Sequence, residues 1–281
     1  MIRSIALLTE YDGTRFSGWQ SQSNGRTVQH VLESALEGLF DHPVKVTGCS
    51  RTDSGVHALG HVSHFEARGS IPTERIPYAL NAVLPDDLVV RYAKEVPVDF
   101  HARYDACAKR YVYRIRNTRC RPVLDRATVS HEPRPLDVDA MVAAAAFLIG
   151  RHDYYSFMAA GSTAKTTVRT LYDIRICRDL KDSVIAIHVT GDGFLYNMVR
   201  ILSGTLLYAG LGKILPEDLP GILAARDRRQ AGKTLPARGL TLEAVFYPMN
   251  GRIETLDGES LPPAWTEGEA KAALKGEAHG T

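Results

Sequence analysis

One segment of the chain combines residue types that can do acid, base or nucleophilic chemistry. It is GCSRTDSGVHALGHVSHF, residues 48–65, in which a polar turn with two glycines lies between two strand-like runs. Arg51 and Asp53 are two residues apart, so an extended turn would let the arginine keep the aspartate ionised and oriented. An ionised, partly buried aspartate can serve as a nucleophile or a base. The competing interpretation is that Thr52 and Asp53 only satisfy backbone donors of the turn.

The elements around this loop are predicted to repeat one order twice. The first series has a strand at 2–10, a helix capped by Thr27, strands at 44–49 and 61–67, a helix near Pro72 and a strand at 87–96. The second series has a strand at 103–117, a helix from Asp137 to Gly150, strands at 169–178 and 183–191, helices at 194–208 and 216–226, and a strand at 241–247. Each β-α-β-β-α-β series predicts a ferredoxin-like half.

These halves predict an α+β protein with one mixed, mainly antiparallel sheet and a cleft between the halves. The first half would span residues 1–102 and the second residues 103–250. Residues 251–281 contain Pro262, Pro263 and many Gly, Glu and Ala residues, so we expect a poorly ordered tail there.

The composition describes a globular chain. Of 281 residues 44% are hydrophobic and 23% charged, which excludes global disorder. The first apolar run, Ile5–Leu8, is too short for a signal sequence or a membrane span, so we expect a soluble, cytoplasmic protein. No C-x-x-C pair occurs, which argues against disulfides and zinc and favours reduced thiols at the four cysteines, Cys49, Cys107, Cys120 and Cys177.

Positive charge is concentrated in two places although the net charge is only +2. Residues 100–121 contain seven Lys or Arg against one acid, namely Arg103, Lys109, Arg110, Arg114, Arg116, Arg119 and Arg121. Residues 226–238 contain five against one. Two such clusters suggest a local site for a polyanion. The alternative is that they are ordinary solvated faces of strands and helices.

The 48–65 loop resembles the R-T-D-x-G-V-H-A signature of the tRNA pseudouridine synthases of the TruA class. Ser50 and Ser54 stand where that family usually has Gly and Ala. The resemblance covers about residues 2–248, and the other matching segments follow in the family's order. They are EYDGTRFSGWQSQ with RTVQHVLESAL, LPDDLVV with VPVDFHARYDACAKRYVYRI, RHDYYSF, GFLYNMVRILSGTL and ARGLTLEAVFY.

The resemblance implies the pseudouridine synthase fold and assigns roles to particular residues. Asp53 matches the catalytic aspartate and Arg51 the arginine beside it. Tyr111 matches a tyrosine that stacks on the target base, Arg200 a basic residue that pairs with the aspartate, and Leu240 an apolar residue under the base. From the residues alone, these last three are an ordinary strand aromatic, a charge on a helix and a core residue. Lys109 and Arg110 are expected to contact RNA phosphates.

The implied reaction isomerises uridine to pseudouridine at positions 38, 39 and 40 of the tRNA anticodon arm, in a homodimer. It needs no metal, nucleotide or redox cofactor. The carboxylate would add to C6 of the uracil, attack C1′ of the ribose, or deprotonate C2′ to give a glycal, and the sequence does not choose among these routes. His57, His61 and His64 lack a cysteine or paired acid, so we expect no metal there.

The sequence fits two other functions less well. A non-catalytic RNA-binding module of two RRM-like halves would show exposed aromatics in an RNP string, and no such string is present. A nucleotide-binding metabolic enzyme would show a P-loop or G-x-G-x-x-G motif after a strand, and the sequence has neither.

Overall fold

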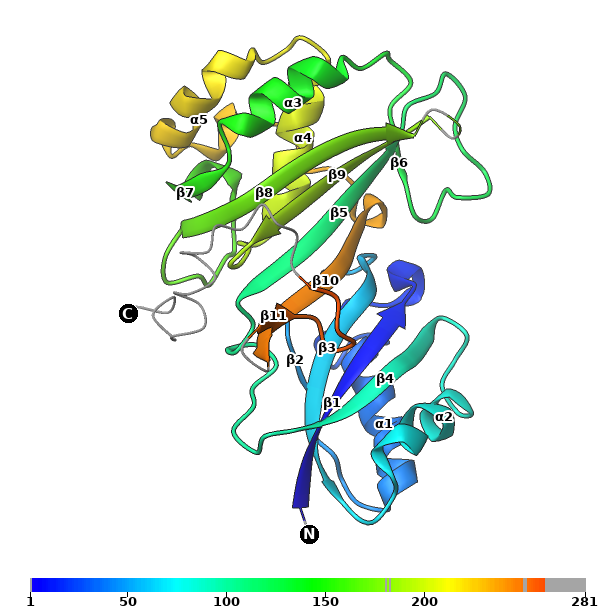
Figure 1. The fold of residues 1–281 in the computed structure, drawn as a ribbon. Coiled ribbons are helices and arrows are strands. Elements are labelled where there is room, and N and C mark those ends of the chain that lie inside the picture. The colour runs from blue at the N-terminus through cyan, green and yellow to red at the C-terminus, as the bar shows by residue number, and fades with distance from the viewer. Residues whose placement is uncertain (1, 180, 182, 250–251, 261–281) are drawn as a thin grey trace. The chain divides into compact units, whose positions relative to one another are not determined.

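The computed structural model describes residues 2–179, 181, 183–249 and 252–260. The chain divides into two compact units, described separately below. Unit 1 contains the described residues up to Lys109 and those from Leu242 onward, and unit 2 contains residues 110–241. Each unit combines strands with helices, and the strand pairs are mostly antiparallel (Figure 1), which confirms the predicted α+β class.

The sheet of unit 1 places its strands in the order β4, β1, β3, β10. β1 (Ile2–Tyr11) is antiparallel to β3 (His57–Arg68) on one side and to β4 (Leu88–Val96) on the other. The short strand β2 (Thr47–Gly48) pairs with β3. β1 thus has a neighbour on each edge, and its residues Ile5–Leu8 are buried.

Two helices pack in the described part of unit 1. α1 (Val28–Phe40) begins after Thr27, whose hydroxyl accepts a hydrogen bond from the His30 N–H, so the predicted cap is confirmed. α2 (Ile76–Asn81) follows a 3₁₀ turn and packs against α1 and β4. The ring of Phe40 lies 5.7 Å from that of Phe65, which joins α1 to β3.

The strand that we predicted to close the second half lies mainly in unit 1. β10 (Leu240–Met249) is the neighbour of β3, and Gly60 permits their approach because a Cβ there would lie 2.5 Å from the Glu243 carbonyl oxygen. Beyond it, β11 (Arg252–Glu254) pairs antiparallel with β10. The structure therefore differs from the expected tail at residues 252–260, where Leu256 is also buried. The rest of that tail lies outside the described residues.

Unit 2 has the strand order β5, β9, β8, β7. β8 (Val168–Asp179) is antiparallel to both β9 (Val184–Gly191) and β7 (Gly150–Asp153). β5 (Ala108–Arg116) pairs in parallel with the two-residue strand β6 (Ser130–His131). β6 and β7 were not predicted, because strands of two and four residues are too short to display an alternating pattern.

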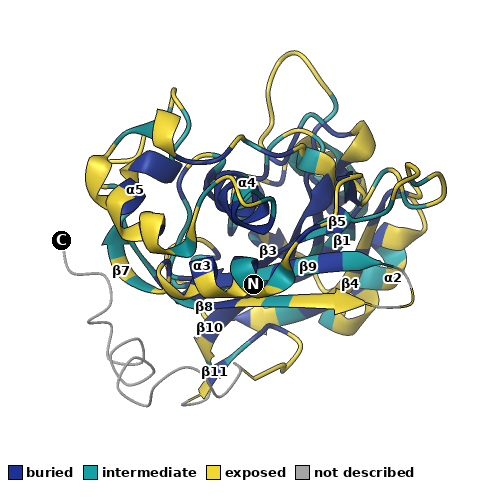
Figure 2. Ribbon diagram, turned by 90° about the horizontal axis from the view of Figure 1, so that it is seen from above, coloured by how far each residue is buried: buried dark blue, intermediate teal, exposed yellow. Residues whose placement is uncertain are grey.

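The helices of unit 2 are α3 (Val138–Ala146), α4 (Met198–Gly210) and α5 (Leu219–Ala225). α4 is buried along almost its whole length, as its dark colour in Figure 2 shows. Gly204 lets residues 231–235 cross the helix, because a Cβ there would lie 1.9 Å from the Lys233 carbonyl oxygen. The prediction started α4 at Phe194, but Asn197 has a left-handed backbone (φ 59°) and the helix begins after it. α3 likewise ends before the predicted Gly150, whose φ of +108° starts β7.

The described residues also bear on membrane spans and on the state of the cysteines. Within the described part of the chain, no helix has the length and apolar character needed to cross a membrane. All four cysteines carry free thiols, with Cys49 and Cys107 buried and Cys120 and Cys177 exposed.

Candidate active site

Asp53 lies on the loop between β2 and β3, and that loop is tied down at several points. His61 on β3 bonds through Nε2 to the Ser50 carbonyl oxygen (3.0 Å). The hydroxyl of buried Thr52 bonds to the hydroxyl of Tyr11 on β1 (2.8 Å). The Val56 N–H closes the turn on the Asp53 carbonyl oxygen (3.1 Å). The Thr52 side chain is thus buried and holds the loop to β1, while Asp53 remains half-buried.

A second segment, residues 13–19, packs against this loop through backbone hydrogen bonds. The Trp19 N–H donates to the Thr52 carbonyl oxygen (3.1 Å), and the Phe16 carbonyl oxygen accepts from the Gly55 N–H (3.4 Å) and from the Ser54 hydroxyl (3.3 Å). Gly18 has φ +93°, and a Cβ there would lie 2.6 Å from the Thr52 carbonyl oxygen. The two backbones touch so closely that only glycine fits at position 18.

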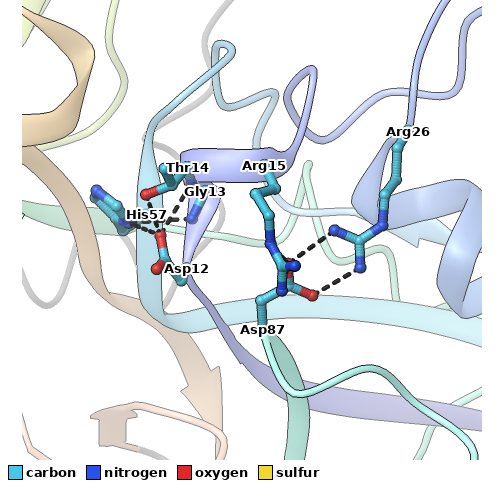
Figure 3. A network of polar contacts seen from close by, with 7 residues as sticks. All are labelled: Asp12, Gly13, Thr14, Arg15, Arg26, His57 and Asp87. Atoms are coloured by element: carbon cyan, nitrogen blue, oxygen red, sulfur yellow. Dashed lines mark hydrogen bonds and ion pairs between the residues drawn. The ribbon is translucent and has the colours of Figure 1, made fainter. Parts of the chain in front are cut away.

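Figure 3 shows a polar network that includes Gly13, Thr14 and Arg15 of this segment. Asp87, directly before β4, accepts two hydrogen bonds from Arg26 (2.7 Å each) and one from Arg15 Nε (3.0 Å). Nearby, the Gly13 N–H donates to Nδ1 of His57 (3.0 Å), and Asp12 Oδ1 lies 3.1 Å from the same nitrogen. His57 Nδ1 thus lies within reach of both the Gly13 N–H and the Asp12 carboxylate.

Burial and charge set the protonation of the groups around the loop. Arg26 holds the pKa of Asp87 below its ordinary value, against the opposing effect of burial, so Asp87 is a carboxylate. Burial lowers the pKa of His61 to about 3, and its ring, stacked 3.6 Å from that of Trp19, stays neutral. Burial raises the pKa of the Cys49 thiol to about 11, although the nearby Lys109 opposes this. Cys49 is therefore an unreactive thiol.

Unit 1 also holds two other predicted site residues. Arg51 is exposed and makes no hydrogen bond or ion pair with any residue that the structure describes, so it does not orient Asp53 as the sequence suggested. The Lys109 ammonium donates to the Cys49 carbonyl oxygen (2.7 Å), which brings a positive charge to the start of the Asp53 loop.

The remaining predicted site residues lie in unit 2, on regular elements or beside them. Tyr111 on β5 is buried, with its ring edge-to-face against Phe194 at 5.1 Å. Arg200 on α4 donates from Nε to the Leu235 carbonyl oxygen (2.7 Å) and from Nη1 to Asn197 (2.5 Å). Leu240 is buried at the start of β10.

Arg110 differs from its expected role as a phosphate contact. It is only 7% exposed, whereas Arg119 and Arg121 of the same basic cluster are exposed. Arg110 lies within β5, where residues 110–113 are all buried, whereas Arg119 and Arg121 follow the end of that strand.

The three histidines of the signature region have separate structural roles. His57 meets Gly13, His61 meets Ser50, and His64 accepts from the Ala102 N–H (3.2 Å). Across the residues described, no group of three or more His, Cys, Asp or Glu side chains is arranged to hold a metal ion.

The α+β fold and the Arg51–Thr52–Asp53 loop together define a protein of the pseudouridine synthase class. A family model described as tRNA pseudouridine synthase matches residues 7–105 and 144–248. The chain belongs to the tRNA pseudouridine synthase family, and it is accordingly an isomerase.

Curated relatives agree with this assignment. "tRNA pseudouridine synthase A" of Acetivibrio thermocellus is 47% identical over 246 residues, which cover 88% of this chain and all of the relative. The protein of the same name from Ruminiclostridium cellulolyticum is also 47% identical, with the same coverage. "tRNA pseudouridine synthase A 2" of Clostridium tetani is 45% identical over 249 residues, again 88% of this chain and all of the relative. The resemblance seen in the sequence is confirmed.

Sequence reasoning missed the polar network that adjoins residues 13–19. Arg15, Arg26 and Asp87 are far apart in sequence, and their pairing follows only from the fold. One signal was present: Arg15, Arg26 and Asp87 all lie in segments that match the family, EYDGTRFSGWQSQ, RTVQHVLESAL and LPDDLVV, but no role had been attached to those matches.

Proposed function

We propose that the protein converts uridine to pseudouridine at positions 38, 39 and 40 of the tRNA anticodon arm, with Asp53 as the reacting carboxylate. The observation that carries the proposal is the geometry of the Asp53 loop. Tyr11 and Trp19 fix Thr52 from inside, so the neighbouring Asp53 is held in place while its side chain stays half-buried. A preorganised carboxylate of this kind suits a step that requires a precise attack.

The chemistry needs an anion and no net redox change. The N1–C1′ bond breaks, the uracil turns, and C5 bonds to C1′, while C5 loses a proton and N1 gains one. Whether the carboxylate adds to C6, attacks C1′ or deprotonates C2′, it must be ionised near pH 7. A neighbouring cation favours that form, and Arg200 is the residue that we assign to this task, as the family resemblance implies.

Tyr111 has two separable tasks in the proposed reaction. Its ring stacks on the target uracil, and its hydroxyl orients the base or relays the C5 proton. The contact with Phe194 supports the first task, because it fixes the ring plane before the base arrives. Leu240 would supply an apolar surface beneath the base, which is consistent with its burial.

The target base must leave its stack, at a cost of a few kcal/mol, and a side chain has to fill or stabilise the gap. We assign this task to Arg51, which is exposed and has no partner among the described residues. Lys109 would add positive charge beside the loop. Arg110 is too buried for a free phosphate contact, and the exposed Arg119 and Arg121 suit that role better.

We also propose that the protein acts as a cytoplasmic homodimer, as the family resemblance implies. A dimer would enlarge the basic surface that holds the tRNA while one anticodon arm enters a site. Sedimentation equilibrium at micromolar concentration tests this: a mass twice that of the chain supports it, and a monomer mass contradicts it.

The test of the function is Asp53→Asn, assayed on unmodified tRNA with site-resolved detection of pseudouridine. We expect no turnover and a tRNA Kd within about threefold of the original, because the change removes the anion and hardly alters shape. Asp41→Asn is the matched control, since Asp41 is an exposed carboxylate at the end of α1 whose left-handed backbone asparagine tolerates. Pseudouridine formed by pure Asp53→Asn protein, with deamidation excluded, would refute the assignment.

A further inference from the structure

Asp87 is a buried carboxylate for which the proposed reaction has no use. Its side chain is only 6% exposed, and it is ionised. Removing a carboxylate from water is costly unless cations and hydrogen bonds replace the water. Here two arginines do so, and they approach from the surface, with 35% of the Arg26 side chain and 69% of the Arg15 side chain exposed.

Both arginines belong to the connection between β1 and α1. Arg15 stands near its start and Arg26 at its end, so one carboxylate ties the two ends of this connection to the start of β4 (Figure 3). The Asp87 carbonyl oxygen adds a further tie, because it accepts from the Asp12 N–H (3.1 Å). The guanidinium of Arg26 also lies over the ring of Phe16, 4.1 Å from its centre.

Phe16 and Trp19, within this connection, bear directly on the Asp53 loop. The Phe16 carbonyl oxygen accepts from Gly55 and Ser54, and the Trp19 N–H donates to Thr52. A continuous series of contacts therefore runs from Asp87 through Arg26 and Phe16 to Ser54 and Gly55, the two residues after Asp53.

We propose that Asp87 is a positioning residue for Asp53. Together with Arg15 and Arg26 it fixes residues 15–26, and the backbone of Phe16 and Trp19 then holds the Asp53 loop in its reactive place. The inference rests on the proposed function in taking Asp53 as the reacting group.

The negative charge of Asp87, and not only its shape, is what this arrangement requires. A carboxylate accepts from both guanidinium groups through its two oxygens. An asparagine of the same size offers one oxygen and turns an N–H₂ group toward an arginine that has no acceptor to offer. Asp87→Asn should therefore loosen one end of the connection while filling the same space.

The experiment compares Asp87→Asn with two matched controls. Asp86→Asn changes the exposed neighbour in the chain. Glu132→Gln changes a second buried carboxylate, 5% exposed, which pairs with Arg134 in the same bidentate way (2.7 and 3.0 Å) but in unit 2. For each protein, kcat and KM on tRNA are measured, together with backbone hydrogen exchange of peptides covering residues 13–19 and 50–57.

For Asp87→Asn we expect kcat to fall at least about tenfold with KM within threefold, and hydrogen exchange of both peptides to rise at least about tenfold. Both controls should keep kcat within twofold and leave these peptides protected. Arg26→Lys, which keeps the charge but loses the bidentate geometry, should shift the same quantities in the same direction by less. If Asp87→Asn fails to fold, Arg26→Lys alone carries the test.

Two results would overturn the inference: unchanged kcat and exchange in Asp87→Asn, or the same losses in Glu132→Gln, which would mean that any buried ion pair affects the loop equally. The exchange measurement does not depend on the reaction. If Asp53→Asn stayed active while Asp87→Asn loosened residues 50–57, the proposed role of Asp53 would fail, and the support of its loop by Asp87 would stand.

Discussion

The loop that carries Asp53 in unit 1 and the elements that carry Tyr111 and Arg200 in unit 2 are held by different interactions. The loop depends on individual hydrogen bonds from Tyr11 and Trp19 and on a close backbone approach at Gly18. Tyr111 lies on a buried strand, and Arg200 lies on the almost fully buried helix α4.

This difference predicts two kinds of sensitivity. A single typical hydrogen bond contributes about 0.5–1.5 kcal/mol, so loop contacts can be lost with little effect on global stability. A displacement of about 1 Å at a reacting group can nevertheless reduce the rate about a hundredfold. Core positions of unit 2 that take no part in the proposed reaction should behave in the opposite way, with large effects on stability and little on the reaction of molecules that remain folded.

The largest expected effect is on the rate of product formation, and it comes from substituting Tyr111 in unit 2. Tyr111→Phe keeps the ring packed on Phe194 and removes the hydroxyl, so we expect near-normal tRNA binding and product formation at least about a hundredfold slower. Tyr111→Ala should also weaken capture of the base by about 1–3 kcal/mol. Single-turnover assays and a binding titration measure both effects.

Tyr154→Phe is the control for Tyr111. Tyr154 is a buried tyrosine of unit 2 whose hydroxyl donates to the Leu148 carbonyl oxygen (2.6 Å), so its loss tests removal of a buried hydroxyl without a chemical role. A wild-type rate for Tyr111→Phe would reduce Tyr111 to a stacking surface.

Gly18→Ala should break the loop side of the comparison. The added methyl group meets the Thr52 carbonyl oxygen, and the left-handed backbone costs alanine about 1–2 kcal/mol. We expect kcat to fall about a hundredfold while the protein stays folded. Gly38→Ala is the control, because position 38 lies in α1 with open space around it. There alanine should raise the free energy of unfolding by about 0.5–1 kcal/mol. Equal kcat values for the two variants would show that residues 13–19 do not position the Asp53 loop.

Leu206→Ala should give the converse result. Leu206 is fully buried on α4, so its truncation is expected to lower the free energy of unfolding by about 2–5 kcal/mol. Activity per folded molecule should stay within twofold, as measured by active-site titration beside a denaturation curve. A large drop in kcat with unchanged stability would contradict the contrast between the units.

The sequence predicted the regular elements well because their patterns are local. Thr27 correctly predicted the start of α1, and the alternating and apolar runs located β1, β4, β8 and β9 within a few residues. The failures have physical causes. Asn197 stops α4 from reaching back to Phe194 through a left-handed backbone, which no periodicity reveals.

The site was predictable only in part. The family resemblance singled out Asp53 and Tyr111, whose roles stay predictions, whereas the pairing of Asp87 with Arg26 joins residues 61 positions apart and is created by the fold. Burial was equally hidden. Arg110 and Arg119 look alike in a basic run, yet the first is covered and the second exposed.

That last contrast gives the prediction of smallest effect, which concerns salt. Arg119 and Arg121 are exposed and make no hydrogen bond or ion pair with the residues described, so they are free to neutralise phosphates. Each true phosphate contact contributes about 0.7–0.9 to the slope of log Kd against log salt concentration. Arg119→Gln and Arg121→Gln should each flatten the slope by about that amount and raise Kd, without abolishing single-turnover chemistry at saturating tRNA.

Arg75→Gln serves as the control, since Arg75 is an exposed arginine outside both basic clusters. Its removal changes the net charge by the same unit, so any general effect of charge on RNA binding appears in it as well. A flattened slope in the Arg119 and Arg121 variants but not in Arg75→Gln would locate phosphate contacts on this segment of unit 2. Identical slopes in all three would mean that residues 119–121 are only a solvated turn, and that the polyanion site suggested by the charge pattern lies elsewhere.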